Sequence, residues 1–275
     1  MDSAVRYPLA ALLFAAAAGA QTPAKPAAAS DGFSAQIHAG VQLDLQGHYA
    51  EARRDFAKAI DAAATAEEKE RALRSMAVSW AFEGNCKEAA KYDGKVYETA
   101  LAAQQFFEAG QVADELARIC IDADDLDSAN EWYRKGYDAG MREPSIKPDR
   151  KDLWEFRWEH AQARISARRG QPGEARKHVA AARKILGRGT NPAQAQFLPY
   201  LAGYVAFYAG EYKIALAELQ NANQKDPFIL CLTAQTYEKL GDRAQAMETY
   251  RKVLTFDAHN PANAYARPLA RKKVG

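Results

Sequence analysis

The chain has 275 residues, of which 48% are hydrophobic and 26% charged, so it can form the buried core of an ordinary soluble protein. Its formal net charge of +2 lacks the concentrated basic footprint of a nucleic-acid-binding protein, and we expect no nucleic-acid partner. Beyond the N-terminus, no segment is apolar over the length that spans a membrane.

Residues 1–20 have the three parts of a secretory signal peptide. Arg6 gives a positive start, Leu9–Ala18 is an apolar run too short to span a bilayer, and Ala18–Ala20 is a small-x-small cleavage site. The alternative interpretation is an alanine-rich amphipathic or disordered tail. We expect cleavage near Ala20, a periplasmic or secreted protein, and a disordered Pro/Ala-rich leader over residues 21–32.

Between residues 33 and 258, the sequence repeats a pattern of two helices joined by a tight turn. In each unit, a small residue stands seven positions before the turn residue and an alanine five positions after it. Small residues at these places let two antiparallel helices approach closely, and a turn glycine can end the first helix with positive φ. The turn positions are held by Gly47, Gly84, Asp124, Gly170, Gly210 and Gly241.

These turns divide the region into six expected helical hairpins, which must stack because one hairpin alone leaves an apolar face uncovered. Residues 259–275 follow as a short basic helix, with Asn260 as its N-cap and Pro261 in its first turn, and we expect this helix to cap the stack. The expected hairpins are Ser34–Ala64, Ala66–Gln104, Phe106–Gly140, Lys151–Leu186, Ala193–Asn223 and Pro227–Phe256.

The repeated pattern resembles the tetratricopeptide repeat family. The resemblance implies an all-α superhelix, a right-handed solenoid of about six hairpins with a C-terminal capping helix. Successive turn residues lie 31 to 46 positions apart, against about 34 in the family, so the middle hairpins are longer than usual. The residues that carry the resemblance are Gly40, Gly47, Tyr49, Ala52, Phe56 and Ala59 in the first unit, Gly203, Gly210, Tyr212, Ala215 and Pro227 in the fifth, and Ala234, Tyr237, Gly241, Ala246 and Tyr250 in the last.

No motif of catalysis or metal binding stands out. The five histidines form neither HxxxH nor HExxH, GxSxG is absent, and no glycine-rich phosphate loop follows a strand. We therefore expect a protein that is not an enzyme and that uses no cofactor or metal.

The three cysteines form no CxxC pair. Cys86 and Cys120 occupy packing positions of the repeat, which predicts that they are buried and act as small hydrophobic residues. The alternative is a Cys86–Cys120 bridge between neighbouring hairpins.

In the family that the chain resembles, the first helix of each hairpin lines a concave groove, and two stripes fall on such helices here. Helical spacing places the basic stripe on one face of the fourth hairpin, and Arg74 and Arg118 extend it into earlier units. An aromatic stripe lies on the matching face of the fifth hairpin, with Phe197 at its start. The candidate binding residues are Arg157, His160, Arg164, Arg168, Tyr200, Tyr204, Phe207 and Tyr208.

We expect the arginines to meet acidic groups or a terminal carboxylate, since guanidinium pairs bidentately with carboxylate. His160 would add a positive charge at mildly acidic pH. The alternatives are that the arginines form a solvated face and that the aromatic stripe belongs to the core.

Two functions are consistent with these patterns. The first is an exported, non-catalytic adaptor that binds a protein or peptide partner in its concave groove. The second is a structural subunit of a cell-envelope assembly that oligomerises through its convex face or its ends. An accessory domain of an enzyme is a third, weaker hypothesis.

Export makes a direct prediction. Because signal peptidase removes the signal segment, the protein made in its own host should begin at or near Gln21. N-terminal sequencing of the protein purified from that host measures this. A cytoplasmic protein that keeps Met1 would contradict export.

Overall fold

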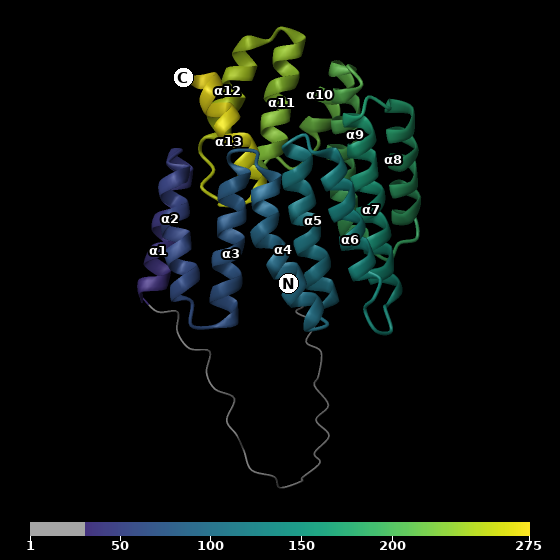
Figure 1. Ribbon diagram of the computed structural model, residues 1–275. Helices are drawn as coiled ribbons and strands as arrows, with labels where there is room; N and C mark the ends of the chain where they lie inside the picture. Colours follow the sequence, from purple (N-terminus) through teal and green to yellow (C-terminus); the bar gives the residue numbers. More distant parts are fainter. Residues whose placement is uncertain (1–30) are drawn as a thin grey trace, which may run out of the picture.

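The computed structural model describes residues 31–275, so the predicted signal peptide and nearly all of the predicted leader lie outside the described residues. Within residues 31–275 the regular structure is entirely helical (Figure 1). The helices are α1 (Asp31–Gln46), α2 (Tyr49–Ala62), α3 (Ala66–Ala81), α4 (Cys86–Ala102), α5 (Phe106–Asp122), α6 (Leu126–Gly140), α7 (Pro148–Arg168), α8 (Pro172–Leu186), the 3-10 helix η1 (Pro192–Phe197), α9 (Leu198–Tyr208), α10 (Tyr212–Gln220), α11 (Pro227–Leu240), α12 (Arg243–Val253) and α13 (Pro261–Val274).

The helices α1 to α12 pair into six antiparallel hairpins, each packed on the next (Figure 1). The predicted all-α superhelical repeat is thereby confirmed. Several hairpin boundaries differ from prediction by one to three residues; α1, for example, begins at Asp31, inside the expected leader, and α7 begins at Pro148, inside the expected loop. None of the described helices has both the length and the apolar character needed to cross a membrane.

All six predicted turn residues adopt positive φ, between 64° at Asp124 and 93° at Gly47. The six alanines five positions after the turns are buried, with at most 1% of their surface exposed. The close approach is visible at Gly203, where an added Cβ would lie 2.7 Å from Cγ of Leu219. The repeat therefore depends on backbone conformation at the turns and on small side chains at the helix crossings.

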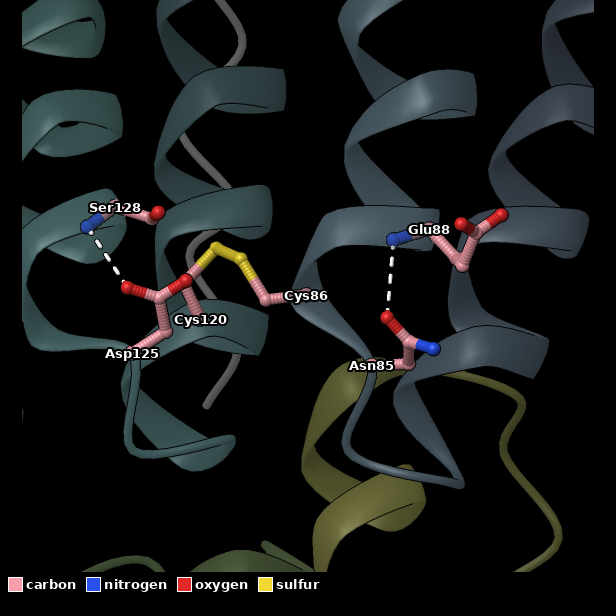
Figure 2. Close-up of a disulfide and its surroundings, with 6 residues drawn as sticks. All are labelled: Asn85, Cys86, Glu88, Cys120, Asp125 and Ser128. Carbon is pink, nitrogen blue, oxygen red and sulfur yellow. Dashed lines mark hydrogen bonds between the residues drawn. A yellow bond between two sulfur atoms is a disulfide. The ribbon is translucent and has the colours of Figure 1, made fainter.

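A disulfide bond joins Cys86, at the start of α4, to Cys120 in α5 (Figure 2). The alternative prediction is thus right, and the preferred prediction of two separate buried thiols is wrong. The reason is that the two repeat positions face each other across neighbouring hairpins, with Cα atoms 4.7 Å apart. Cys231 is free and buried, and burial raises the pKa of its thiol to about 12.

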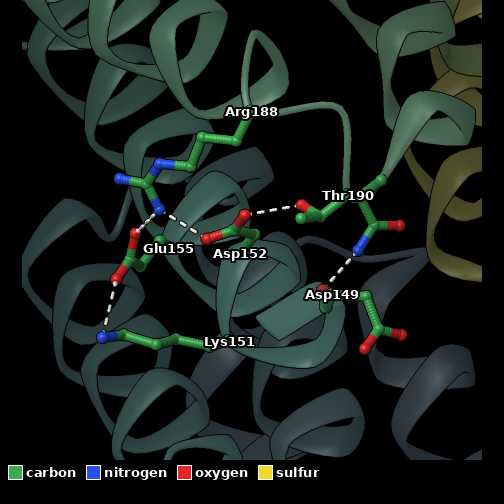
Figure 3. Close-up of polar contacts among 7 residues, drawn as sticks. Asp149, Lys151, Asp152, Glu155, Arg188 and Thr190 are labelled. Atoms are coloured by element: carbon green, nitrogen blue, oxygen red, sulfur yellow. Dashed lines mark hydrogen bonds and ion pairs between the residues drawn. The ribbon is translucent and has the colours of Figure 1, made fainter. Parts of the chain in front are cut away.

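The loop before η1 is fixed to the start of α7 by charged contacts (Figure 3). Asp152 accepts hydrogen bonds from Arg188 and from the hydroxyl of Thr190, and Arg188 also contacts Glu155. These contacts fix the loop between the fourth and fifth hairpins to α7, the helix that carries the predicted binding arginines.

The C-terminal helix α13 packs on α11 and α12, and it also contacts α3 and α5 (Figure 1). Asp44 of α1 is fully buried, and its carboxylate lies 2.8 Å from Nε2 of His259 and accepts a hydrogen bond of 2.9 Å from Ser79. Arg267 of α13 donates a hydrogen bond of 2.8 Å to the carbonyl oxygen of Leu45. The two ends of the superhelix are therefore joined.

Candidate functional site

The inner helices of the superhelix face one cavity of about 1370 Å³. Its walls come from α1, α3, α5, α7 and α11, the first helices of their hairpins, with residues from η1, α9 and the start of α13. The inner helices thus line the concave side, as the resemblance implied.

The part of the cavity lined by α3 and α5 is rich in glutamates, and Arg74 lies among them. Its guanidinium lies 3.5 Å from the carboxylate of Glu70 and 3.3 Å from that of Glu108, and it also pairs with Glu115. Asp93 stands behind this cluster on α4 with 1% of its surface exposed. Burial and the nearby charge of Glu115 raise the pKa of Asp93 well above its ordinary value. At this end of the cavity, the positive charge of Arg74 is therefore balanced by glutamates of the protein itself.

The part lined by α5 and α7 has two arginines, of which Arg164 is buried and Arg118 is partly exposed. Arg164 is 6% exposed and donates a hydrogen bond to the hydroxyl of Tyr133, while its Nε is buried without a partner. The guanidinium of Arg118 lies 5.1 Å from the ring centroid of Phe228, and its Nε is likewise buried without a partner. Among the described residues, neither arginine has a carboxylate at ion-pairing distance.

His160 lies beside Arg164 on the same wall, between the rings of Phe156 and Tyr200 at centroid distances of 5.9 and 5.6 Å. Its Nε2 is buried and has no hydrogen-bond partner. Burial, together with the charges of Arg164 and Arg118, holds the pKa of His160 well below its ordinary value. The expectation that His160 gains charge at mildly acidic pH is therefore wrong for the free protein.

The other two predicted arginines already have carboxylate partners. Arg157 lines the cavity and lies 3.6 Å from the carboxylate of Asp114, and Arg168 lies 2.7 Å from that of Asp124. Burial raises the pKa of Asp114 to about 7, although the nearby arginines oppose the shift. Helical spacing placed the arginines on one face, but their partners come from the preceding hairpin, which spacing within a helix does not reveal.

Of the aromatic stripe, Tyr200 lines the cavity and Phe197, 40% exposed, lies at its edge. Tyr204 is fully buried and packs against Tyr208, whose ring centroid is 4.7 Å away. Phe207 and Tyr208 are partly buried against the same core. For these three residues the alternative interpretation, core packing, describes the structure.

Several residues that line the cavity were not predicted from the sequence. Asn223, Lys225 and Asp226 precede α11, while His259 and Asn260 precede α13. They reach the cavity because the last hairpin and α13 close against the first hairpins, an arrangement that no local pattern marks. Within residues 31–275, no group of three His, Cys, Asp or Glu side chains is placed to hold a metal ion.

Comparison with known families assigns the last hairpin. Residues 229–260, which include most of α11 and all of α12, match the family model described as tetratricopeptide repeat. This segment of the chain is thus similar to one tetratricopeptide repeat. Tetratricopeptide repeats generally act as non-catalytic scaffolds for interactions between proteins, and stacked repeats of this kind present extended concave surfaces.

Among solved structures, the chain is similar to a putative kinesin light chain from Podosopora anserina with nearly identical repeats of this type. The two are 17% identical, and the match covers 80% of this chain and 92% of that chain with a TM-score of 0.42. A tetratricopeptide repeat protein from Parabacteroides merdae is 11% identical, with 89% and 98% covered and a TM-score of 0.36. Comparison with curated proteins gives no significant match.

The raised pKa of Asp114 predicts a dependence of stability on pH. Its folded pKa of about 7 lies above the ordinary value of 3.8, so between these values the folded protein holds a proton that the unfolded chain has released. This contribution to the free energy of unfolding is greatest at low pH and is lost as pH rises through about 7.

The wild-type protein should therefore lose more unfolding free energy between about pH 5 and about pH 8 than an Asp114→Asn variant does. Urea denaturation of both proteins at the two pH values measures the difference. Other titrating groups, including Asp122, are common to both proteins and cancel. Equal changes in the two proteins would show that Asp114 titrates alike in the folded and unfolded chains.

Proposed function

We propose that this protein is an exported, non-catalytic adaptor that binds an extended segment of a partner protein in its concave cavity. The observation that carries the proposal is the size of the cavity, about 1370 Å³, with lining residues from both the first helix α1 and the last helix α13. This volume is larger than that of typical small-molecule pockets, which are about 300–1,000 Å³. A stretch of several residues fits such a space better than a single small ligand.

The lining suits a peptide, because it contains both apolar and charged side chains. Ile37, Val41 and Val78 contribute apolar surface on α1 and α3, and Phe156 and Ile229 do so on α7 and α11. Charged groups of the same lining, such as Arg74 and Glu115, are partly exposed. A protein segment offers both kinds of side chain in one chain, so a mixed wall can contact successive residues of it.

Two features support export. The first is the signal-like sequence of residues 1–20. The second is the Cys86–Cys120 disulfide, since disulfides persist in oxidising compartments such as the periplasm and the extracellular space. Both features fit an adaptor that works outside the cytoplasm.

The test is capture of partners from envelope extract with matched tryptophan variants. Gln111 lines the cavity on α5, so Gln111→Trp should fill part of the binding space. Gln245 is exposed on α12, outside the cavity, so Gln245→Trp is the matched control. Circular dichroism checks that both variants keep their helical content.

We expect mass spectrometry to find partners that wild type and Gln245→Trp retain and that Gln111→Trp loses. If Gln111→Trp retains every partner, the cavity is not the binding surface. That result would favour the alternative, a subunit of an envelope assembly that oligomerises through its convex face or its ends.

A further inference from the structure

The arginines of the cavity differ in how their charge is balanced. Arg74 has three glutamate partners and Arg157 has Asp114, while Arg71 is exposed to solvent. Arg164, which is buried, and Arg118, which is partly exposed but has a buried Nε, are cavity arginines that lack an ion-pairing carboxylate among the described residues. A buried charge without a partner is costly, so natural proteins rarely leave one unless a ligand or water completes the site.

Three unpartnered nitrogen atoms belong to this one region. They are Nε of Arg118, Nε of Arg164 and Nε2 of His160, and all three residues line the cavity. A guanidinium carries only donors, and its Nε–H and Nη–H groups form a fork that matches two oxygen atoms of one carboxylate. The two buried Nε–H donors therefore lack an acceptor at hydrogen-bond distance.

The carboxylates of Asp226 and Asp122 act on Arg118 through their charge, but neither lies at ion-pairing distance from Arg118 or Arg164 among the described residues. Asp226 lines the cavity, but its Oδ1 accepts a hydrogen bond of 2.8 Å from the backbone N–H of Phe228 as the N-cap of α11. Asp114 lies beside Arg157. Asp122 lines a second cavity of about 180 Å³ under α13, and neither of its carboxylate oxygens has a hydrogen-bond partner among the described residues. Burial raises the pKa of Asp122 to about 6, although the charges of Arg118 and Arg164 oppose the shift.

We propose that Arg118 and Arg164, with His160 beside them, form a subsite for a carboxylate group of the bound segment. The subsite rests on the proposed function, since it names the chemistry by which the cavity holds its partner. The carboxylate is either the C-terminus of the segment or a Glu or Asp side chain. Phe156, Tyr200 and Ile229 line the same part of the cavity and provide apolar contact for the neighbouring side chain.

The probes are small molecules that carry one carboxylate in either context. N-acetylphenylalanine presents a terminal carboxylate beside an aromatic ring, and N-acetylglutamic acid α-amide presents a side-chain carboxylate. N-acetylphenylalaninamide has the ring but no carboxylate, and it is the control ligand. Nuclear magnetic resonance of the arginine Nε–H groups, in protein labelled with nitrogen-15 arginine, detects even weak binding at these side chains.

We expect both carboxylates to shift the Nε–H signals of Arg118 and Arg164, and the amide to leave them unchanged. The probe that binds more tightly shows whether the subsite prefers a C-terminal carboxylate or a side-chain carboxylate. Arg118→Gln should weaken the tighter probe about tenfold or more, because it removes a buried charge-assisted hydrogen bond. Arg164→Gln should have the same effect. If that variant fails to fold, Arg164→Lys tests the same point, because it keeps the positive charge but removes the guanidinium fork.

Arg71→Gln is the matched control, since it removes an equal charge from an exposed position of the same cavity. It should change the affinity by less than about twofold, because solvent screens an exposed charge. Equal shifts with the amide, or an equal loss with Arg71→Gln, would overturn the subsite. If neither carboxylate binds while Gln111→Trp still abolishes partner capture, the subsite fails and the adaptor function stands.

Discussion

The contact between the C-terminal helix and the first hairpin fixes the shape of the space inside the superhelix. Arg267 donates hydrogen bonds to three backbone carbonyl oxygens, one from Leu45 at the end of α1 and two from Leu254 and Phe256 after α12. Asp44 is buried beside His259. Because a buried carboxylate is stable only with its partners in place, this contact resists separation of the two ends.

Joining the ends turns a set of inner helix faces into one cavity with a desolvated part. The segments before α11 and α13 stand across the cavity from α5 and α7. Arg118 of α5 lies against the ring of Phe228 of α11, so its partial burial depends on the last hairpin lying close to the third. Arg164 is buried by nearer neighbours such as Tyr133 of α6. A guanidinium that is removed from water in this way is stabilised by a negatively charged ligand.

The hairpins could be predicted from the sequence because their determinants are local. Gly210 and Asp124 take positive φ within a few residues of the helices that they separate, and Ala215 is buried by its own hairpin. The joined ends could not be predicted, since Asp44 and His259 are 215 residues apart and no repeat position marks either residue. The disulfide could be predicted only as an alternative. Its two cysteines are 34 residues apart, which is close to one repeat and places them on neighbouring hairpins.

The candidate site shows the same division. Helical spacing correctly grouped Arg157, His160 and Arg164, and all three line the cavity. It could not distinguish the paired Arg157 from the unpaired Arg164, because the partner, Asp114, belongs to another hairpin. It also assigned Tyr204 to a binding face, although an apolar helix surrounded by neighbours buries such a residue.

The most direct test of this account is the distance between the two ends of the superhelix in solution. Spin labels at Arg54→Cys on α2 and Arg251→Cys on α12 occupy exposed positions, while Cys86 and Cys120 are bonded and Cys231 is buried. Double electron–electron resonance should give one narrow distance distribution, and Arg267→Ala should broaden it toward longer distances. A broad distribution in the protein with native Arg267 would contradict the joined superhelix on which the cavity and its carboxylate subsite depend.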